Sequence, residues 1–156
     1  MLSIVVVVAV RCLLILLFLP FSALDKVLNF AQAVDQASLA TTSRALARLL
    51  IGIGFGVEVL MSLAILSGIF DRPAALILAI YCIVTALLWK QFWKAPDFRL
   101  RGKSTGRELF WDFLKNLAVA GGLLVLAVGT DAAAVRQFWH DPLGSTHPYS
   151  TIASDP

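Results

Sequence analysis

The chain has 156 residues, of which 59% are hydrophobic and only 15% are charged, and its net charge is +3. Soluble domains are usually about 45–50% apolar and about 25% charged, so this composition excludes an ordinary soluble domain. The length suits a single domain, and the apolar excess indicates an integral membrane protein.

Four apolar segments are long enough to cross a membrane. Each reaches the roughly 17–25 residues that span about 30 Å of hydrocarbon as a helix. Polar backbone groups in lipid must be satisfied within the chain, so these segments are expected to be helices. The sequence predicts an all-α fold, an integral membrane four-helix bundle over residues 1–130 followed by a polar C-terminal tail over residues 131–156. The predicted spans are residues 2–19, 45–70, 73–93 and 109–129.

The segment between the first two spans has the periodicity of an amphipathic helix. Its apolar residues recur at the spacing of one helix face. Polar residues, including Lys26, fill the other positions. We expect this segment to lie along the membrane surface or to fold back against the bundle. The residues of the apolar face are Leu24, Val27, Leu28, Ala31 and Val34.

The connection between the second and third spans is very short. Asp71 and Arg72 are expected to form a tight turn, and Pro73 suits the first turn of the helix that follows. These two spans are therefore predicted to be an antiparallel hairpin. In the tail, residues 132–139 predict a short surface helix, and the chain beyond Asp141 is expected to be disordered.

Charge predicts the topology. Residues 90–108 contain six basic and two acidic side chains, a net charge of +4. Short loops rich in Lys and Arg remain in the cytoplasm, so we expect this loop to be cytoplasmic and both termini to lie outside. The expected location is the bacterial inner (plasma) membrane. Such a short loop between two spans does not suggest nucleic-acid binding.

Arg11 and Glu58 each lie alone near the middle of an apolar span. An ionised group at the bilayer centre costs roughly 2.5–3.5 kcal/mol on insertion scales. Antiparallel neighbours bring the two residues to a similar depth, so we expect a mutual ion pair. That pair could lock two helices in register, or it could bind a polar ligand or relay protons.

A second polar group is predicted near the start of the fourth span. Asp112, Lys115 and Asn116 are spaced to share one helix face. With Lys26 and Lys90 they could line a polar vestibule, or they could form a salt-bridged rim.

Two further patterns bear on packing and chemistry. Gly52 and Gly56 have the small-xxx-small spacing that lets a neighbouring helix approach closely. His140 and His147 lack the spacing of metal ligands, and no nucleophile or nucleotide motif is found. We therefore expect no metal site, no catalytic residue and no intrinsic cofactor.

Motifs spread over residues 8–128 resemble the DoxX family of small four-span membrane proteins. The motif of the fourth span is the most specific of them. A histidine often found in the family at the end of the third span is replaced here around Trp89 and Lys90. The matching elements are Arg11, residues 25–30, Glu58, residues 66–68, residues 72–76, residues 110–118 and residues 121–124.

The resemblance implies an association with membrane oxidoreductase systems, such as thiosulfate:quinone oxidoreductases and oxidative-stress complexes. It suggests a non-catalytic subunit or accessory of a respiratory or redox complex that binds a quinone, a lipid or a partner subunit. The chain would then not be an enzyme alone, and its partners would be the lipid membrane and other subunits. The candidate binding residues are Arg11, Lys26, Glu58, Lys90, Asp112, Lys115 and Asn116.

Two other functions fit the same residues. The first is a small transporter or permease for a polar solute or proton, with the charged groups along its pathway. The second is a structural protein that recruits a soluble enzyme through the basic loop.

Overall fold

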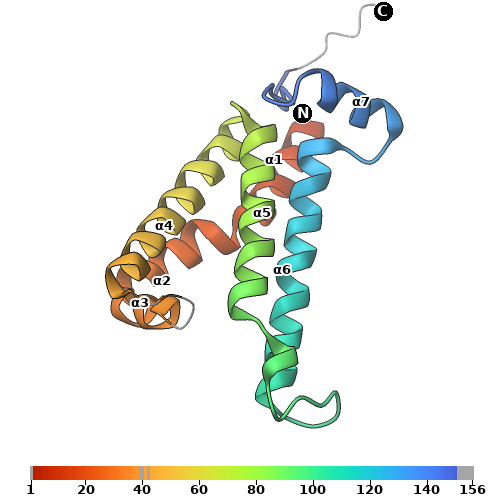
Figure 1. Cartoon of the computed structure of the whole chain (residues 1–156). Coiled ribbons are helices and arrows are strands. Elements are labelled where there is room, and N and C mark those ends of the chain that lie inside the picture. Colours follow the sequence, from red (N-terminus) through yellow and green to blue (C-terminus); the bar gives the residue numbers. More distant parts are fainter. Residues whose placement is uncertain (1, 39–40, 42, 151–156) are drawn as a thin grey trace, which may run out of the picture.

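The computed structural model describes residues 2–38, 41 and 43–150. Within these ranges the chain is helical and contains no strand (Figure 1). Two short helical segments, Leu17–Ser22 and Phe92–Lys94, accompany the α-helices. The α-helices are α1 (Leu2–Ile15), α2 (Ala23–Leu28), α3 (Phe30–Ser38), α4 (Arg44–Ser67), α5 (Asp71–Trp89), α6 (Thr105–Val128) and α7 (Ala132–His140).

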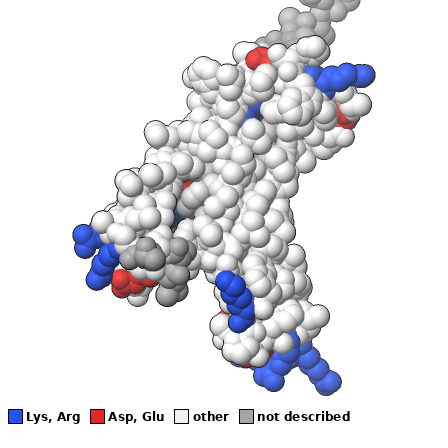
Figure 2. Space-filling view, in the orientation of Figure 1, with Lys and Arg blue, Asp and Glu red and all other residues white. Residues whose placement is uncertain are grey.

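Four helical stretches in the described part of the chain are long and apolar enough to cross a membrane. This confirms the predicted all-α membrane fold. Figure 2 shows a nearly uncharged middle, with Lys, Arg, Asp and Glu gathered toward the ends of the molecule. The stretches are Leu2–Leu28, Arg44–Ser67, Asp71–Lys94 and Thr105–Val128.

The bundle has two distinguishable ends in Figure 1. We call one the turn end, because it holds the turn between α4 and α5 together with the start of α1 and α7. We call the other the loop end, because it holds residues 90–104 between α5 and α6. The predicted tail helix is present as α7, with Phe138 buried.

The turn between α4 and α5 comes earlier than predicted. Gly68 ends α4 in the left-handed conformation with φ of 73°, and Phe70 follows with φ of 52°. Glycine adopts this conformation readily and commonly ends a helix in this way. Asp71 and Arg72, expected to form the turn, are instead the first two residues of α5. The hairpin itself is present, since α4 and α5 pack together.

Helix α5 lies at the centre and packs against both α4 and α6. Its buried face consists mainly of small residues, which let the neighbouring helices approach closely. Ile65 of α4 and Leu123 of α6 are fully buried against it. The buried residues of α5 in this core are Ala74, Ala75, Leu78, Ala79 and Cys82.

The close helix contacts use different glycines from those predicted. A Cβ atom at Gly52 or Gly56 would meet nothing within 4 Å, so the predicted contact face is wrong within this chain. At Gly54 the same atom would lie 3.0 Å from the Tyr81 hydroxyl. The reason is helical phase: Gly54 lies on the buried face of α4, whereas Gly52 is exposed and Gly56 only partly buried.

The first span is longer than the predicted 2–19, because α1 continues through a kink into α2. The kink lies at Leu19, which has non-helical angles (φ −121°, ψ 112°), next to Pro20. After the kink the chain crosses toward α4 (Figure 1).

The predicted amphipathic segment forms α2 and α3 and folds back against the bundle. Val34 and Ala37 of α3 pack on Ala47 of α4. In α2 the apolar side chains Leu24, Val27 and Leu28 are instead exposed. Lys26, on the other side of α2, faces the interior. This arrangement, with apolar side chains outside and Lys26 inside, suits a helix that is surrounded by lipid.

Candidate functional site

The sequence predicts an ion pair between Arg11 and Glu58, but Arg11 has other partners in the structure. Its guanidinium donates one hydrogen bond to the carbonyl oxygen of Ile65 (2.5 Å) and another to Asp71 Oδ2 (2.6 Å). The Arg11 and Asp71 side chains are 3% and 0% exposed. Arg11 and Asp71 therefore form a buried ion pair between α1 and the first turn of α5.

Residues 141–150, which we call the C-terminal strap, complete this site. The Thr146 backbone N–H donates to Asp71 Oδ1 (2.8 Å), and its hydroxyl lies between Asp71 Oδ2 and the Arg11 guanidinium. Tyr149 donates to the carbonyl oxygen of Leu66. The expectation of disorder beyond Asp141 is therefore wrong for the described part of the tail. The reason is that Asp71, a buried carboxylate, needs more donors than Arg11 alone supplies.

Side-chain direction explains why the predicted pair does not form. In a helix each side chain leans toward the helix N-terminus. Helices α1 and α4 run in opposite directions, so Arg11 extends toward the turn end and Glu58 toward the loop end. Two residues at a similar backbone depth thus reach different partners.

Glu58 is 2% exposed and accepts hydrogen bonds from three side chains. Lys26 Nζ donates to both carboxylate oxygens, at 2.7 Å and 2.8 Å. Ser22 (3.1 Å) and the Tyr81 hydroxyl (2.9 Å) both donate to Oε1. Among the described residues, Oε1 therefore has three donors and Oε2 has one, which leaves acceptor capacity on Oε2.

Sequence features of three helices place these groups. Gly54, one turn before Glu58, provides the space into which Tyr81 of α5 projects. Ser22 immediately precedes α2 and Lys26 lies four residues further on, so their side chains share one face, and Lys26 also donates to Ser22 (2.7 Å). The kink at Pro20 directs that face toward α4.

Glu58 lies at the wall of a cavity of about 590 Å³, which we call the central cavity. Its size falls in the range of about 300–1,000 Å³ that is typical of small-molecule sites. Its walls come from the kinked segment, α2, α3, α4, α5 and α6 and are largely apolar. The polar residues that line it are Ser22, Asp25, Lys26, Gln36, Glu58, Tyr81, Thr85, Lys90, Asp112, Lys115 and Asn116.

A second ion cluster lies at the loop end of this cavity. Asp112 accepts from Lys90 Nζ and from Lys115 Nζ, each at 3.2 Å. One carboxylate is thus shared by two ammonium groups. Lys115 is 74% exposed and Asp112 is 41% exposed, so this cluster lies at the surface of the molecule, unlike Glu58.

The structure brings together six of the seven residues that the sequence suggested. Lys26, Glu58, Lys90, Asp112, Lys115 and Asn116 all line the central cavity. Arg11 lies elsewhere. Along α5, Tyr81 and Asp71 are ten residues apart, or about 15 Å at 1.5 Å per residue. Ile65 and Leu78, both fully buried, fill the interior between these levels.

The sequence did not identify Asp71 and Thr146 as partners of Arg11, nor Ser22 and Tyr81 as partners of Glu58. The sequence predicts that Asp71 belongs to a turn, although an acidic residue between two apolar spans is also a candidate partner for a buried cation. A tyrosine hydroxyl within an apolar span needs a hydrogen-bond partner, and this signal points to Tyr81. Within the described ranges, no group of three or more His, Cys, Asp or Glu residues could hold a metal ion.

Comparison with known proteins gives two matches. Residues 6–91 match the family described as DoxX, and this range contains both Arg11 and Glu58. The inner membrane protein YphA of Escherichia coli (strain K12) is 29% identical over 125 residues, which cover 80% of this chain and 82% of that protein. No solved structure matches the chain.

Proposed function

Since this chain belongs to the DoxX family of integral membrane proteins, we propose that it is a non-catalytic subunit of a membrane oxidoreductase complex whose central cavity holds a quinol or quinone headgroup. We place it in the inner membrane, as the name of the YphA relative suggests. One observation carries the proposal: an apolar cavity of about 590 Å³ has the buried Glu58 carboxylate at its wall.

The chemistry of Glu58 supports a ligand that carries a hydroxyl group. Within the part of the chain that the structure describes, Glu58 Oε2 accepts only from Lys26, so a quinol hydroxyl could donate to it. Lys115 supplies further N–H donors at the loop end, since it has a single carboxylate partner within the described ranges. The apolar walls suit the ring and the start of the isoprenoid chain.

Packing favours a binding site over a passage. A transporter would need a polar route across the bundle. Toward the turn end, Ile65, Leu78 and Leu123 are each 0% exposed and lie beyond Glu58. The Arg11–Asp71 site beyond them has its polar groups bonded to one another and to the strap.

The test is the quinone content of the protein purified in mild detergent from bacterial membranes, measured by solvent extraction and mass spectrometry. Wild-type protein is expected to retain quinone close to one per chain. Glu58→Gln should lower retention about tenfold, because a hydrogen bond to a charged group contributes about 1.5–3 kcal/mol. Tyr81→Phe should lower it less, because Glu58 keeps its other donors.

Thr85→Val is the matched control. Thr85 also lines the cavity, but its hydroxyl donates to the Cys82 carbonyl oxygen (3.0 Å), away from Glu58. Its quinone content should equal that of wild-type protein. Quinone-free wild-type protein, or equal retention in Glu58→Gln, would reject the proposed ligand.

Three further measurements address the rest of the proposal. A subunit of a redox complex should copurify with a larger oxidoreductase after mild solubilisation. Proton or solute flux in proteoliposomes of the protein alone, reduced by Glu58→Gln, would favour the transporter function instead. Reporter fusions after the strap and within residues 99–103 would establish whether the loop end is cytoplasmic, as its charge predicts.

A further inference from the structure

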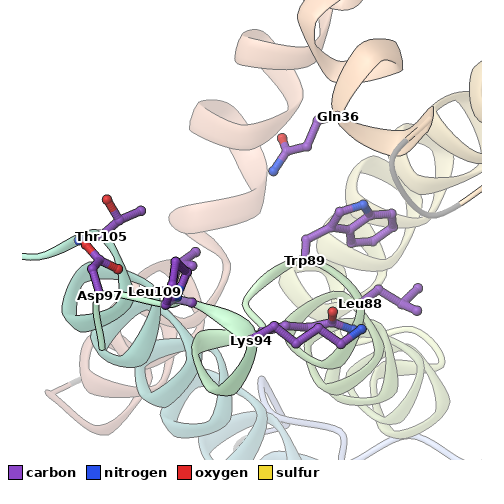
Figure 3. A pocket seen from close by; sticks show the side chains of 10 residues that line it. Gln36, Leu88, Trp89, Lys94, Asp97, Thr105 and Leu109 are labelled. Atoms are coloured by element: carbon purple, nitrogen blue, oxygen red, sulfur yellow. Dashed lines mark hydrogen bonds between the residues drawn. The ribbon is translucent and has the colours of Figure 1, made fainter. Parts of the chain in front are cut away.

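A second hollow lies at the loop end, beside the central cavity. It has a volume of about 740 Å³, and we call it the loop groove. Figure 3 shows Gln36 and Trp89 facing it from α3 and α5, with Lys94, Asp97 and Thr105 around its other sides. Leu88, Ala95, Pro96 and Leu109 give it apolar walls, and Gln91 completes the lining.

The loop that forms this groove has a defined conformation. The Asp97 carboxylate accepts hydrogen bonds from the backbone N–H groups of Thr105 (2.7 Å) and Gly106 (3.0 Å). A Cβ atom at Gly106 would lie 2.7 Å from Phe98 Cα, so the loop and the start of α6 are in direct contact. Asp97 therefore joins the loop to the start of α6 and keeps its negative charge.

Aromatic side chains support the same loop. Phe92 contacts three other phenylalanine rings, with centroid distances of 5.1–5.5 Å. Trp93 and Trp111, beside this cluster, are 49% and 47% exposed. Half-exposed tryptophans at the end of membrane-spanning helices are typical of the membrane–water interface. The loop groove therefore lies at the level of lipid headgroups.

The net charge around the groove is positive, because the four cations near it outnumber the Asp97 carboxylate. Lys94 lines the groove, and the loop beyond carries three more exposed cations. Among the described residues none of these four has a carboxylate within ion-pair distance. Figure 2 shows blue side chains at this end of the molecule. The three other cations are Arg99, Arg101 and Lys103.

We propose that the loop groove binds an anionic phospholipid, with its phosphate near Lys94 and its acyl chains along Leu88 and Leu109. A lipid fits better than an acidic protein segment because the cations adjoin an apolar wall that continues onto membrane-spanning helices. Basic residues near a membrane surface attract anionic lipids. This site is separate from the Glu58 wall of the central cavity, although the two hollows share Gln36, Leu88 and Trp89.

Native mass spectrometry of the full chain can test the proposal. Detergent-solubilised protein would be incubated with equal amounts of phosphatidylglycerol and phosphatidylcholine. We expect wild-type protein to retain phosphatidylglycerol preferentially, and Lys94→Gln to lower that preference about fivefold, the effect of one interfacial cation. The double variant Arg101→Gln/Lys103→Gln, which removes two cations, should lower the preference for phosphatidylglycerol more than Lys94→Gln does.

The matched control is Arg136→Gln, because Arg136 is an exposed cation of α7 at the turn end. It should keep the wild-type preference, and so should Glu58→Gln, whatever that variant does to quinone content. Equal retention of the two lipids by wild-type protein, or an equal loss in Arg136→Gln, would overturn the proposal. Lys94-dependent binding of polyglutamate without lipid preference would overturn it in favour of an acidic protein partner.

Discussion

Asp71 and Glu58 are both buried carboxylates paired with a cation, yet their surroundings differ. Asp71 is bonded to Arg11 and to Thr146, and the C-terminal strap covers it. Glu58 is bonded to Lys26, Ser22 and Tyr81, and it lies at the wall of a cavity. The first arrangement joins elements of the fold, whereas the second leaves space and acceptor capacity for a ligand. A buried ion pair alone therefore does not distinguish a structural role from a binding role.

The largest expected effect is that of Asp71→Ala on stability. The substitution leaves Arg11 buried without its carboxylate, which should cost about 3–5 kcal/mol. Thermal unfolding of the detergent-solubilised protein should show a lower midpoint, and the yield of folded protein should fall. The control is Asp35→Ala, which removes the exposed pair with Arg44 and should cost no more than about 1 kcal/mol. Equal losses would contradict a structural role for Asp71.

A double-mutant cycle sharpens the comparison. Arg11→Met and Asp71→Leu should be coupled by about 0.5–3 kcal/mol, because the two side chains are in contact. Arg11→Met and Glu58→Gln should be additive within about 0.3–0.5 kcal/mol, because the two sites are separate. Unfolding by denaturant would give both values. Strong coupling between Arg11 and Glu58 would restore the pairing that the sequence suggested.

Gly54→Ala should affect the Glu58 site more than the fold. The added methyl group would meet the Tyr81 hydroxyl at 3.0 Å and should displace it from Glu58. The lost hydrogen bond is offset by the better helix propensity of alanine, so the net cost should be about 1 kcal/mol. Quinone retention should fall to the level of Tyr81→Phe. Gly52→Ala, where the methyl group meets nothing, should leave quinone retention unchanged and stabilise the protein by about 1 kcal/mol through helix propensity alone.

The smallest effect is expected at Asp97, an exposed carboxylate outside the membrane-spanning helices. Hydrogen bonds from the backbone N–H groups of Gly106 and Thr105 hold the pKa of Asp97 below its ordinary value of 3.8. A lowered pKa stabilises the folded loop above pH 3.8, and this contribution is lost as the pH falls through the lowered value.

Hydrogen exchange at the start of α6 measures this contribution. Asp97→Ala should exchange slightly faster than wild-type protein at neutral pH, and the difference should vanish in strong acid. Asp35→Ala, which removes an exposed carboxylate of α3, is the control and should leave exchange at the start of α6 unchanged. A difference that persists in strong acid would show that the carboxylate charge is not responsible.

Much of the fold could be predicted because lipid imposes a simple rule. Apolar runs of sufficient length must be helices, so four spans and the short hairpin followed from composition alone. The end of the first span could not be predicted, since periodicity does not reveal that α1 continues beyond Pro20 into α2. Nor does it reveal that α2 presents Lys26 inward and its leucines outward.

The candidate site was predicted in part. Asp112, Lys115 and Asn116 were grouped correctly because helix spacing determines which residues share a face. Arg11 and Glu58 were paired wrongly, because similar depth on two helices does not specify side-chain direction. Asp71 and Thr146 could not be assigned to Arg11 from the sequence, since they are 60 and 135 residues away from it.

That separation has a consequence for biosynthesis. Chains are extended at about 5–20 residues per second, so Arg11 is made about 3–12 s before Asp71 and about 7–27 s before Thr146. The first span is therefore complete while its arginine still lacks both partners. Thr146 of the strap is synthesised 75 residues after Asp71, and only then can the turn end of the bundle reach its final hydrogen bonding.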